Sequence, residues 1–415
     1  MNQPAIKQIA KQLRDIVSNT SKPESGSLSN FQMHDGVAYN WTSEAAISFN
    51  EIVGKILKQK DFSQKFSSKY VDQKLKTLFA ELLSDEKVDL EEELVLLISA
   101  LSSFEQNTVV FLKIEGIVLS LCFELGRVRF VPGDQHLIFY IKNEASKIIK
   151  SSRSNEEGKN FYHNFISQQA EAVSSGGCVG IVEVNAEPIR AFEVAKEEVR
   201  RAIDVLRFSS KAIYPLKEDI RIGLEGDHPR SNRHGFVFSE AGLNTKSDSV
   251  GSVRPFEIKQ ESLERMNDVG VFEISSALRK KQANNFEESL IRSIHWFSVA
   301  LTQSENSNSF LFLVVALESL FKAERGNSIG GTVAESVAFL VSDNLTGRKR
   351  IVSLVREYYG KRSGVAHGGK KTITDADLCT LINITGTSIM VAIEKLSEFT
   401  SQKQFMGWIE DQKLT

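Results

Sequence analysis

The chain has 415 residues, of which 41% are hydrophobic and 25% charged, and its formal net charge is −2. These values are ordinary for a soluble globular protein of two or three domains, and they exclude nucleic-acid binding through overall positive charge. The three cysteines are widely spaced, which argues against a disulfide framework and a structural zinc site. The N-terminus lacks a signal-peptide core, and the longest apolar run, 310–317, is far short of the roughly 20 residues that span a bilayer. We therefore expect a cytoplasmic protein with no membrane association.

Residues 1–105 predict a mainly helical segment, and residues 106–274 predict an α+β region. The expected strands are rich in β-branched and aromatic residues and are separated by turn signals. They are the segments TVVFLKIEGI, VLSLCFEL, RVRFVP, HLIFYIK, CVGIVEVNA, DIRIGLEG and HGFVFSE. A helix is expected from Pro188, because apolar residues from Phe192 to Leu206 recur at helical spacing on one face. The Gly/Ser-rich run LNTKSDSVGSV predicts an exposed loop.

From about residue 257 the strand signals stop, and the remaining segments predict helices joined mostly by short loops. We place a domain boundary near residue 275, ahead of an all-α bundle over 275–415. The expected fold class is therefore α+β, with an N-terminal mixed α/β region followed by a C-terminal helical bundle. No functional site is evident in residues 1–274, which we expect to recognise a trigger, a regulator or RNA.

The segment 344–371 carries eight basic residues against a single acid. Such a density of charge can neutralise phosphates, although cations also favour a helix C-terminus or a solvated helix face. Arg362 and His367 lie within this segment, five residues apart, which places them about 140° apart around an ideal helix. Gly364 lies between them and two glycines follow His367, so we expect the helix to loosen or end here and both side chains to reach one side.

Arginine presents a planar fork of donors to a phosphate, and histidine exchanges protons near neutral pH. RNA cleavage without a metal needs a base for the ribose 2′-OH, an acid for the leaving 5′ oxygen and a cation for the developing negative charge. The R-x4-H spacing alone is common in proteins. Glu318 adds to it, because a carboxylate within the apolar run FLFLVVALESLF is costly unless it is paired. Glu318 either occupies a helix edge or binds a structural arginine, or it positions Arg362 or His367.

Four segments in order, SIHWFSVAL, FLFLVVALESLF, TVAESVAFLVS and YYGKRSGVAHGG, resemble the HEPN superfamily and most closely its Apea-like branch, over about 283–400. The resemblance implies a helical bundle that often forms a homodimer. It also implies a metal-independent endoribonuclease that serves in antiviral defence, abortive infection included, or as a toxin. Arg362 and His367 take the family's catalytic positions on this interpretation, Glu318 takes that of its helix-two acid, and Ser363 is the polar residue after the arginine.

The same interpretation has Lys361, Lys370, Lys371 and Tyr359 contact the RNA, for which tRNA is one candidate. It requires no cofactor and no metal, and its products carry 2′,3′-cyclic phosphate ends. A dimer is expected because one R-x4-H motif supplies one histidine, whereas the reaction needs a base and an acid. Gly369 stands where HEPN toxins paired with a nucleotidyltransferase carry a tyrosine, so regulation through that tyrosine is not expected. The alternative is a non-catalytic HEPN module that binds a nucleotide or a partner and dimerises.

Two further stretches contain histidines but do not predict a site. His295 follows an apolar helical pattern beside Trp296 and Phe297, and we interpret it as a core or dimer-interface histidine. The run GDHPRSNRHG lacks the ligand spacing of a zinc site, and we interpret it as an exposed loop between strands.

Overall fold

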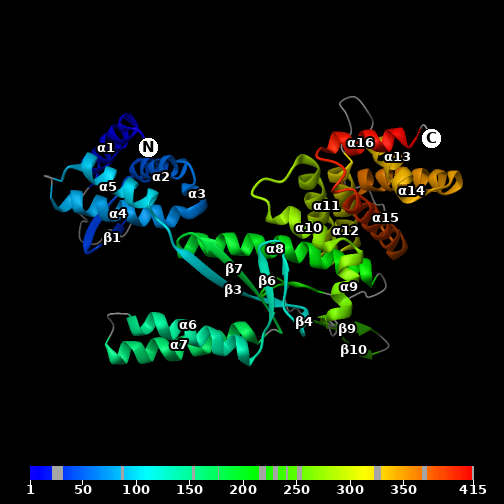
Figure 1. The fold of residues 1–415 in the computed structure, drawn as a ribbon, viewed down its shortest axis with the longest axis horizontal. Coiled ribbons are helices and arrows are strands. Elements are labelled where there is room, and N and C mark those ends of the chain that lie inside the picture. Colours follow the sequence, from blue (N-terminus) through cyan, green and yellow to red (C-terminus); the bar gives the residue numbers. More distant parts are fainter. Residues whose placement is uncertain are drawn as a thin grey trace. The chain divides into compact units, whose positions relative to one another are not determined.

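The computed structural model describes residues 1–20, 31–85, 88–151, 155–175, 177–214, 221–227, 232–239, 242–249, 255–321, 329–366 and 372–413. The chain divides into two compact units (Figure 1). Unit 1 comprises Met1–Val110 and Glu183–Lys196, and unit 2 comprises Phe111–Val182 and Glu197–Thr415. The expected α+β fold class, with a helical C-terminal region, is confirmed.

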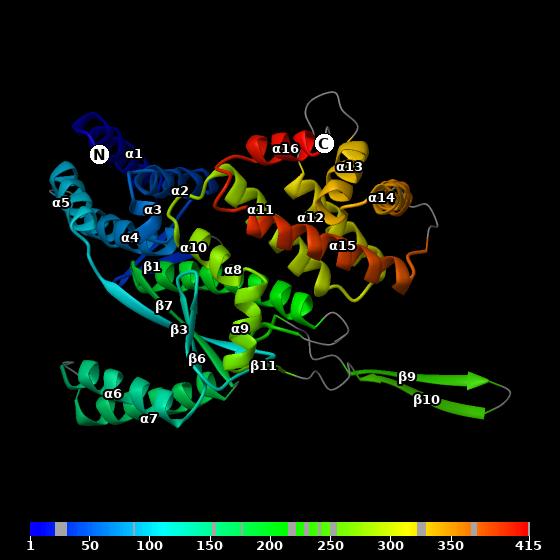
Figure 2. The ribbon, with the colours of Figure 1, turned by 45° about the vertical axis from the view of Figure 1, so that its right-hand side comes forward.

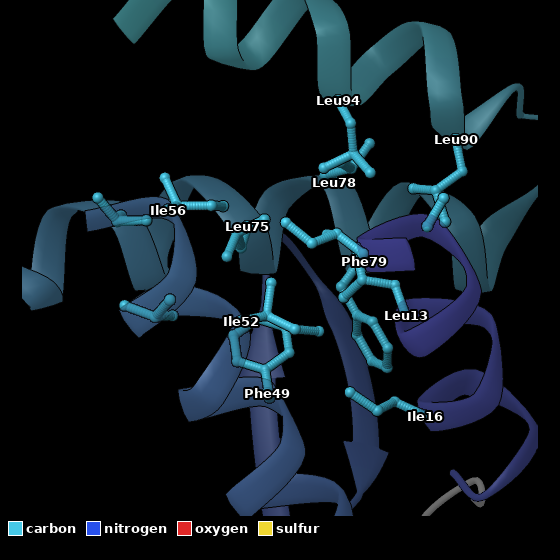
Figure 3. Packing of buried hydrophobic residues seen from close by; sticks show 14 of the residues in the cluster. Leu13, Ile16, Phe49, Ile52, Ile56, Leu75, Leu78, Phe79, Leu90 and Leu94 are labelled. Carbon is cyan, nitrogen blue, oxygen red and sulfur yellow. The ribbon is translucent and has the colours of Figure 1, made fainter. Parts of the chain in front are cut away.

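Unit 1 consists of helices and a β-hairpin around an aromatic core. Its elements are α1 (Gln3–Ser18), β1 (Phe31–His34), β2 (Val37–Asn40), α2 (Ser43–Leu57), α3 (Phe62–Lys65), α4 (Ser68–Ser84) and α5 (Leu90–Ser102). Four of the helices begin at a side chain that accepts a hydrogen bond from the first turn, namely Asn2, Thr42, Ser67 and Asp89. The rings of Tyr39, Trp41, Phe49 and Phe79 lie with centroids 4.8–5.9 Å apart. Figure 3 shows aliphatic side chains of α1, α2, α4 and α5 packed around Phe49 and Phe79.

A buried carboxylate, Glu187, caps the N-terminus of α8 (Pro188–Ile213) inside unit 1. Its Oε1 accepts hydrogen bonds from the backbone N–H groups of Ser67 at 3.0 Å and Arg190 at 2.9 Å, and its Oε2 accepts one from Ile189 at 2.8 Å. Burial disfavours the charged carboxylate, but these hydrogen bonds outweigh it and lower the pKa of Glu187. The charge therefore joins the start of α8 to the start of α4.

We expect Glu187→Gln to destabilise unit 1 at neutral pH by about 1–3 kcal/mol, because the amide cannot accept all three hydrogen bonds. Since the folded pKa of Glu187 lies below the unfolded value of about 4.3, its contribution is complete above that value and is lost as pH falls through the folded pKa. Urea unfolding at a series of pH values measures this. The difference from wild type should shrink towards zero on acidification, whereas the exposed control Glu51→Gln should show little difference at any pH. A difference that does not change with pH would contradict this account.

The largest sheet among the described residues has five strands. The strand order is β5 (Phe123–Leu125), β6 (Val128–Pro132), β7 (Cys178–Asn185), β3 (Asn107–Glu115) and β8 (Gly223–Leu224). A short parallel pair joins β4 (Ile117–Leu119) to β11 (Phe256–Ile258). Helix α8 packs closely on the sheet at Gly180, where an added Cβ would lie 3.2 Å from Val199 Cγ2. The buried face of α8 confirms the expected helical spacing, except that Phe192 is 48% exposed.

Two segments of unit 2 differ from their expected structures. HLIFYIK lies in helix α6 (Gln135–Ser151), which pairs with α7 (Glu156–Ser174), so the expected strand is wrong. Strand propensity depends on context, and here the Asp134 carboxylate accepts hydrogen bonds from the first turn of the helix and starts it. The expected loop LNTKSDSVGSV is also wrong over most of its length, because β10 (Gly242–Ser249) pairs antiparallel with β9 (Asn232–Ser239), as Figure 2 shows. Backbone pairing, which the polar composition did not indicate, forms this hairpin.

From residue 260 onward the described chain is helical, as expected. The helices are α9 (Gln260–Asp268), α10 (Val271–Arg279), α11 (Asn285–Leu301), α12 (Asn306–Leu320), α13 (Ile329–Val341), α14 (Leu345–Ala366), α15 (Asp375–Glu394) and α16 (Gln402–Asp411). Gly270, with φ +78°, separates α9 from α10. This left-handed conformation favours glycine, and an added Cβ would lie only 2.3 Å from Ile393 Cγ2.

Within the described residues α15 is the one helix long and apolar enough to cross a membrane by length and composition. It packs against α11, α12 and α13 inside the bundle, and residues such as Leu381, Ile389 and Ile393 are buried there. A core helix has this composition for the same reason as a membrane helix, because both are surrounded by apolar groups. Unit 2 thus holds a sheet and a bundle, and α14 runs along the outside of the bundle in both views (Figure 1 and Figure 2).

Candidate functional site on helix α14

Helices α12 and α14 bring Glu318 and Arg362 together. Arg362 Nη2 donates to Glu318 Oε2 at 3.2 Å, and the two side chains are 39% and 21% exposed. Glu318 lies in the last turn of α12, where the helix dipole disfavours negative charge, so the guanidinium compensates for this placement. The carboxylate that interrupts the apolar run is therefore paired with Arg362, and part of the guanidinium stays open to solvent.

Tyr359 lies one turn before Arg362 and packs inward. An added Cβ on Gly330 of α13 would lie 2.9 Å from Tyr359 Cδ1, so the glycine makes room for the ring. The Tyr359 hydroxyl is buried and makes no hydrogen bond of ordinary geometry among the described residues. Burial and the nearby Glu318 carboxylate raise its pKa well above the usual range. Tyr359 thus places a neutral phenol beside the ion pair, and its hydroxyl is not presented to an RNA at the surface.

Lys361 is already engaged by acids. Its Nζ lies 2.7 Å from Asp377 Oδ1 and 3.0 Å from Glu357 Oε1, and the bond to Asp377 raises the pKa of the lysine. Asp377 also completes the capping box of α15 with Thr374. Lys361 therefore joins α14 to the start of α15, and its charge is largely neutralised. Ser363, by contrast, is exposed beside Arg362.

The remaining expected site residues, His367, Lys370 and Lys371, lie outside the described residues. Helix α14 continues without a break through Gly364 to Ala366. The expected loosening at Gly364 is therefore wrong, and the helix reaches the residue before His367. A glycine inside a helix costs only about 1 kcal/mol relative to alanine, which packing in a bundle can offset.

A basic groove, here named the α14 groove, lies near the N-terminal half of the same helix and has a volume of about 570 Å³. Its cations are Arg348, Lys349, Arg356 and Lys413. The Arg348 guanidinium lies over the Phe339 ring at 4.2 Å, and its Nε donates to the Ser342 carbonyl at 2.9 Å, which fixes its position.

Two acids contact these cations among the described residues: Glu335 lies 3.4 Å from Arg356 and 3.2 Å from Lys413, and Glu410 lies 2.7 Å from Lys413. Two cations, Arg348 and Lys349, thus remain without an acidic partner within the described part of the chain. On an ideal helix Arg356 lies about 9 Å, and Arg348 about 21 Å, before Arg362 along the axis. Around the axis of an ideal helix, Arg348 lies about 40° and Arg356 about 120° from Arg362, so of these two cations Arg348 is the one that shares a face with Arg362.

The sequence pointed to the basic character of this region but not to the groove. Its walls come from α13, α14 and the residues after α16, so no local spacing marks them. Within the described residues, no group of three or more His, Cys, Asp or Glu side chains is arranged to hold a metal ion.

Comparison of the chain with protein-family models, with curated protein sequences and with solved structures found no match. The fold and the contacts themselves define an α+β protein with a helical C-terminal bundle, in which helix α14 lines a basic groove and its Arg362 pairs with Glu318 of α12.

Proposed function

We propose that this protein is a metal-independent endoribonuclease of the HEPN type, which acts in the cytoplasm as an effector of antiviral defence or as a toxin. The observation that carries the proposal is the Arg362–Glu318 pair. It holds a partly exposed guanidinium near the C-terminal end of α14, five residues before His367 in the sequence, on a helix that also lines the α14 groove. A fixed cation and a histidine are the groups that phosphodiester transfer requires.

The proposed reaction uses the chain's own side chains. An imidazole removes the proton from the ribose 2′-OH, the 2′ oxygen forms a bond to phosphorus, and the bond from phosphorus to the 5′ oxygen breaks. A second imidazole protonates the leaving oxygen, and Arg362 stabilises the extra negative charge on the phosphoryl oxygens. His367 from each copy of a homodimer supplies the two imidazoles, while Glu318 positions Arg362 and Ser363 lies beside it.

The α14 groove is the proposed path of the RNA backbone. Arg348 and Lys349 have no acidic partner in the described residues, so their charges are available to phosphates, and phosphate contacts of this kind fix a strand in register. Lys361 is assigned to joining α14 to α15 instead, because Asp377 and Glu357 occupy it. Lys370 and Lys371 remain proposed RNA contacts.

A non-catalytic module is the second candidate, and one observation favours it. Glu318 already neutralises Arg362, and the buried phenol of Tyr359 lies beside the pair, so the cluster could serve only to join α12 to α14. In that case the bundle binds a nucleotide or a partner, and no RNA is cut.

Expression in cells separates the two candidates. The endoribonuclease predicts that wild-type protein, once its trigger is present, slows growth and fragments cellular RNA, whereas His367→Ala does neither at equal expression. Arg350→Gln, an exposed substitution on α14 outside the groove, should behave as wild type. Equal RNA damage by wild type and His367→Ala would overturn the proposal. So would intact RNA in all cultures across a panel of infecting phages.

A further inference from the structure

A second concave site lies in unit 2, away from the residues proposed for RNA cleavage. It is a cavity of about 490 Å³, here named the α8–α11 cavity. Its wall is formed by α8, by α11 and by the segment that joins α10 to α11. This volume is in the range of roughly 300–1,000 Å³ that is usual for small-molecule sites. The polar residues that matter in its wall are Arg201, Asp204, Lys280, Lys281, Arg292 and His295.

An aspartate on α8 holds the histidine in place. His295 Nδ1 lies 2.8 Å from Asp204 Oδ2, and Ser298 Oγ donates to Asp204 Oδ1 at 2.6 Å. Arg207 donates to Ser298 Oγ at 3.2 Å and to the Ile222 carbonyl at 2.6 Å, so the aspartate is backed by a fixed cation. Because Asp204 occupies Nδ1, the imidazole can offer only Nε2 to a ligand. His295 is therefore an oriented, half-exposed group, so the expected core position is wrong, while the expected dimer-interface position stays a prediction.

The charge around the cavity is mainly positive. The hydrogen bond that His295 donates to Asp204 raises the pKa of His295, against an opposing effect of burial and of Arg207. Lys280 is paired with Glu287, and Arg201 lies 3.7 Å from Glu198.

Two cations of the cavity wall have no acidic partner among the described residues. In the ranges that the structure describes, Lys281 and Arg292 form no ion pair, and Glu288 is the acid besides Asp204 that lines the cavity. Unpaired cations beside an oriented imidazole are donors that suit an anion, and the guanidinium fork matches the geometry of phosphate as well as that of carboxylate.

The other part of the wall is apolar. Val205, Leu278, Ile291 and Ile294 line the cavity together with the cations. A ligand that matches both parts carries a phosphate at one end and a less polar body at the other.

We propose that the α8–α11 cavity binds a phosphorylated small molecule, with the phosphate held by Lys281, Arg292 and the Nε2 of His295. This site is independent of the proposed RNA cleavage. The protonated imidazole is the better phosphate donor, so binding weakens as pH rises through the raised pKa of His295.

Calorimetric titration of the full-length protein tests the site with inorganic phosphate, ribose 5-phosphate and adenosine 5′-monophosphate, and with adenosine as the uncharged comparison. We expect at least one phosphorylated probe to bind more tightly than adenosine. Arg292→Gln and His295→Gln should each weaken that binding about tenfold or more, since each removes a charge-assisted hydrogen bond. The matched control Lys403→Gln, an exposed cation on α16, should not weaken it.

Thermal unfolding of each variant shows whether it is folded, and the exposed position of Arg292 makes Arg292→Gln the safer of the two. The proposal is overturned if no phosphorylated probe binds, or if the three variants bind it equally. A single-stranded RNA oligonucleotide is titrated as a further probe. The proposal is also overturned if Arg292→Gln weakens binding of this RNA but of no phosphorylated small molecule, since the cavity would then be part of an RNA-binding surface.

Discussion

Arg362→Ala should reduce the rate of RNA cleavage by about 10²–10³-fold. This is the usual loss when one preorganised hydrogen-bond donor to the negative charge of the transition state is removed. The guanidinium is held by Glu318 before substrate arrives, so little reorganisation is needed when charge develops on the phosphoryl oxygens. The measurement is single-turnover cleavage of an end-labelled RNA by the purified protein. The loss should lie in the cleavage rate constant and much less in RNA affinity, because the groove cations remain.

A structural role for Arg362 must be distinguished from a catalytic one. Arg362→Ala leaves the Glu318 carboxylate half-buried without its cation, which itself destabilises the bundle. The double variant Glu318→Gln/Arg362→Gln removes both charges and should recover stability without recovering activity. Arg350→Gln, exposed on the same helix, should keep full activity. Recovery of cleavage in the double variant would show that Arg362 serves only the fold.

Phe79→Ala should cost unit 1 about 3–5 kcal/mol of unfolding free energy, which is the range for deleting a buried aromatic side chain. Phe79 is fully buried, and its ring lies 5.4–5.9 Å from those of Tyr39, Trp41 and Phe49. The cost combines lost transfer free energy with a cavity that the rigid neighbouring rings cannot fill.

Hydrogen exchange measured by mass spectrometry on the full chain resolves this effect by segment. Peptides of α2 and α4 should lose protection in Phe79→Ala. The control Leu96→Ala removes a side chain that is 55% exposed on α5 and should change protection within about 0.5 kcal/mol. Equal protection in the two variants would contradict the assignment of the core.

The sequence predicted the fold class and most elements because the spacing at which hydrophobic residues recur distinguishes strands from helices over long segments. TVVFLKIEGI, RVRFVP and CVGIVEVNA are strands β3, β6 and β7, and Pro188 begins α8. The misassigned segments are those where local composition conflicts with pairing or capping. HLIFYIK has strand-forming residues, but Asp134 starts a helix there. The polar run of β10 forms a strand because β9 pairs with it.

The site was predictable in part. Because an unpaired carboxylate in an apolar run is energetically unfavourable, the sequence indicated that Glu318 needs a partner. Arg362 was one of the expected partners, and the two side chains are paired. The pairing of Lys361 with Asp377 could not be predicted, because it depends on how α14 packs beside the start of α15. Asp204 gave no signal either, since its role follows from α8 lying against α11. Spacing along the chain cannot indicate such contacts between distant segments.

We propose that Arg362 and His367 cut RNA through attack of the ribose 2′-OH on the neighbouring phosphorus. Mass spectrometry of the fragments made by purified wild-type protein, with EDTA present and with His367→Ala in parallel, tests it directly. The account predicts fragments ending in 2′,3′-cyclic phosphate and 5′-hydroxyl, formed at the same rate with or without EDTA and absent with His367→Ala. Fragments with 3′-hydroxyl and 5′-phosphate ends, or cleavage that EDTA abolishes, would contradict it.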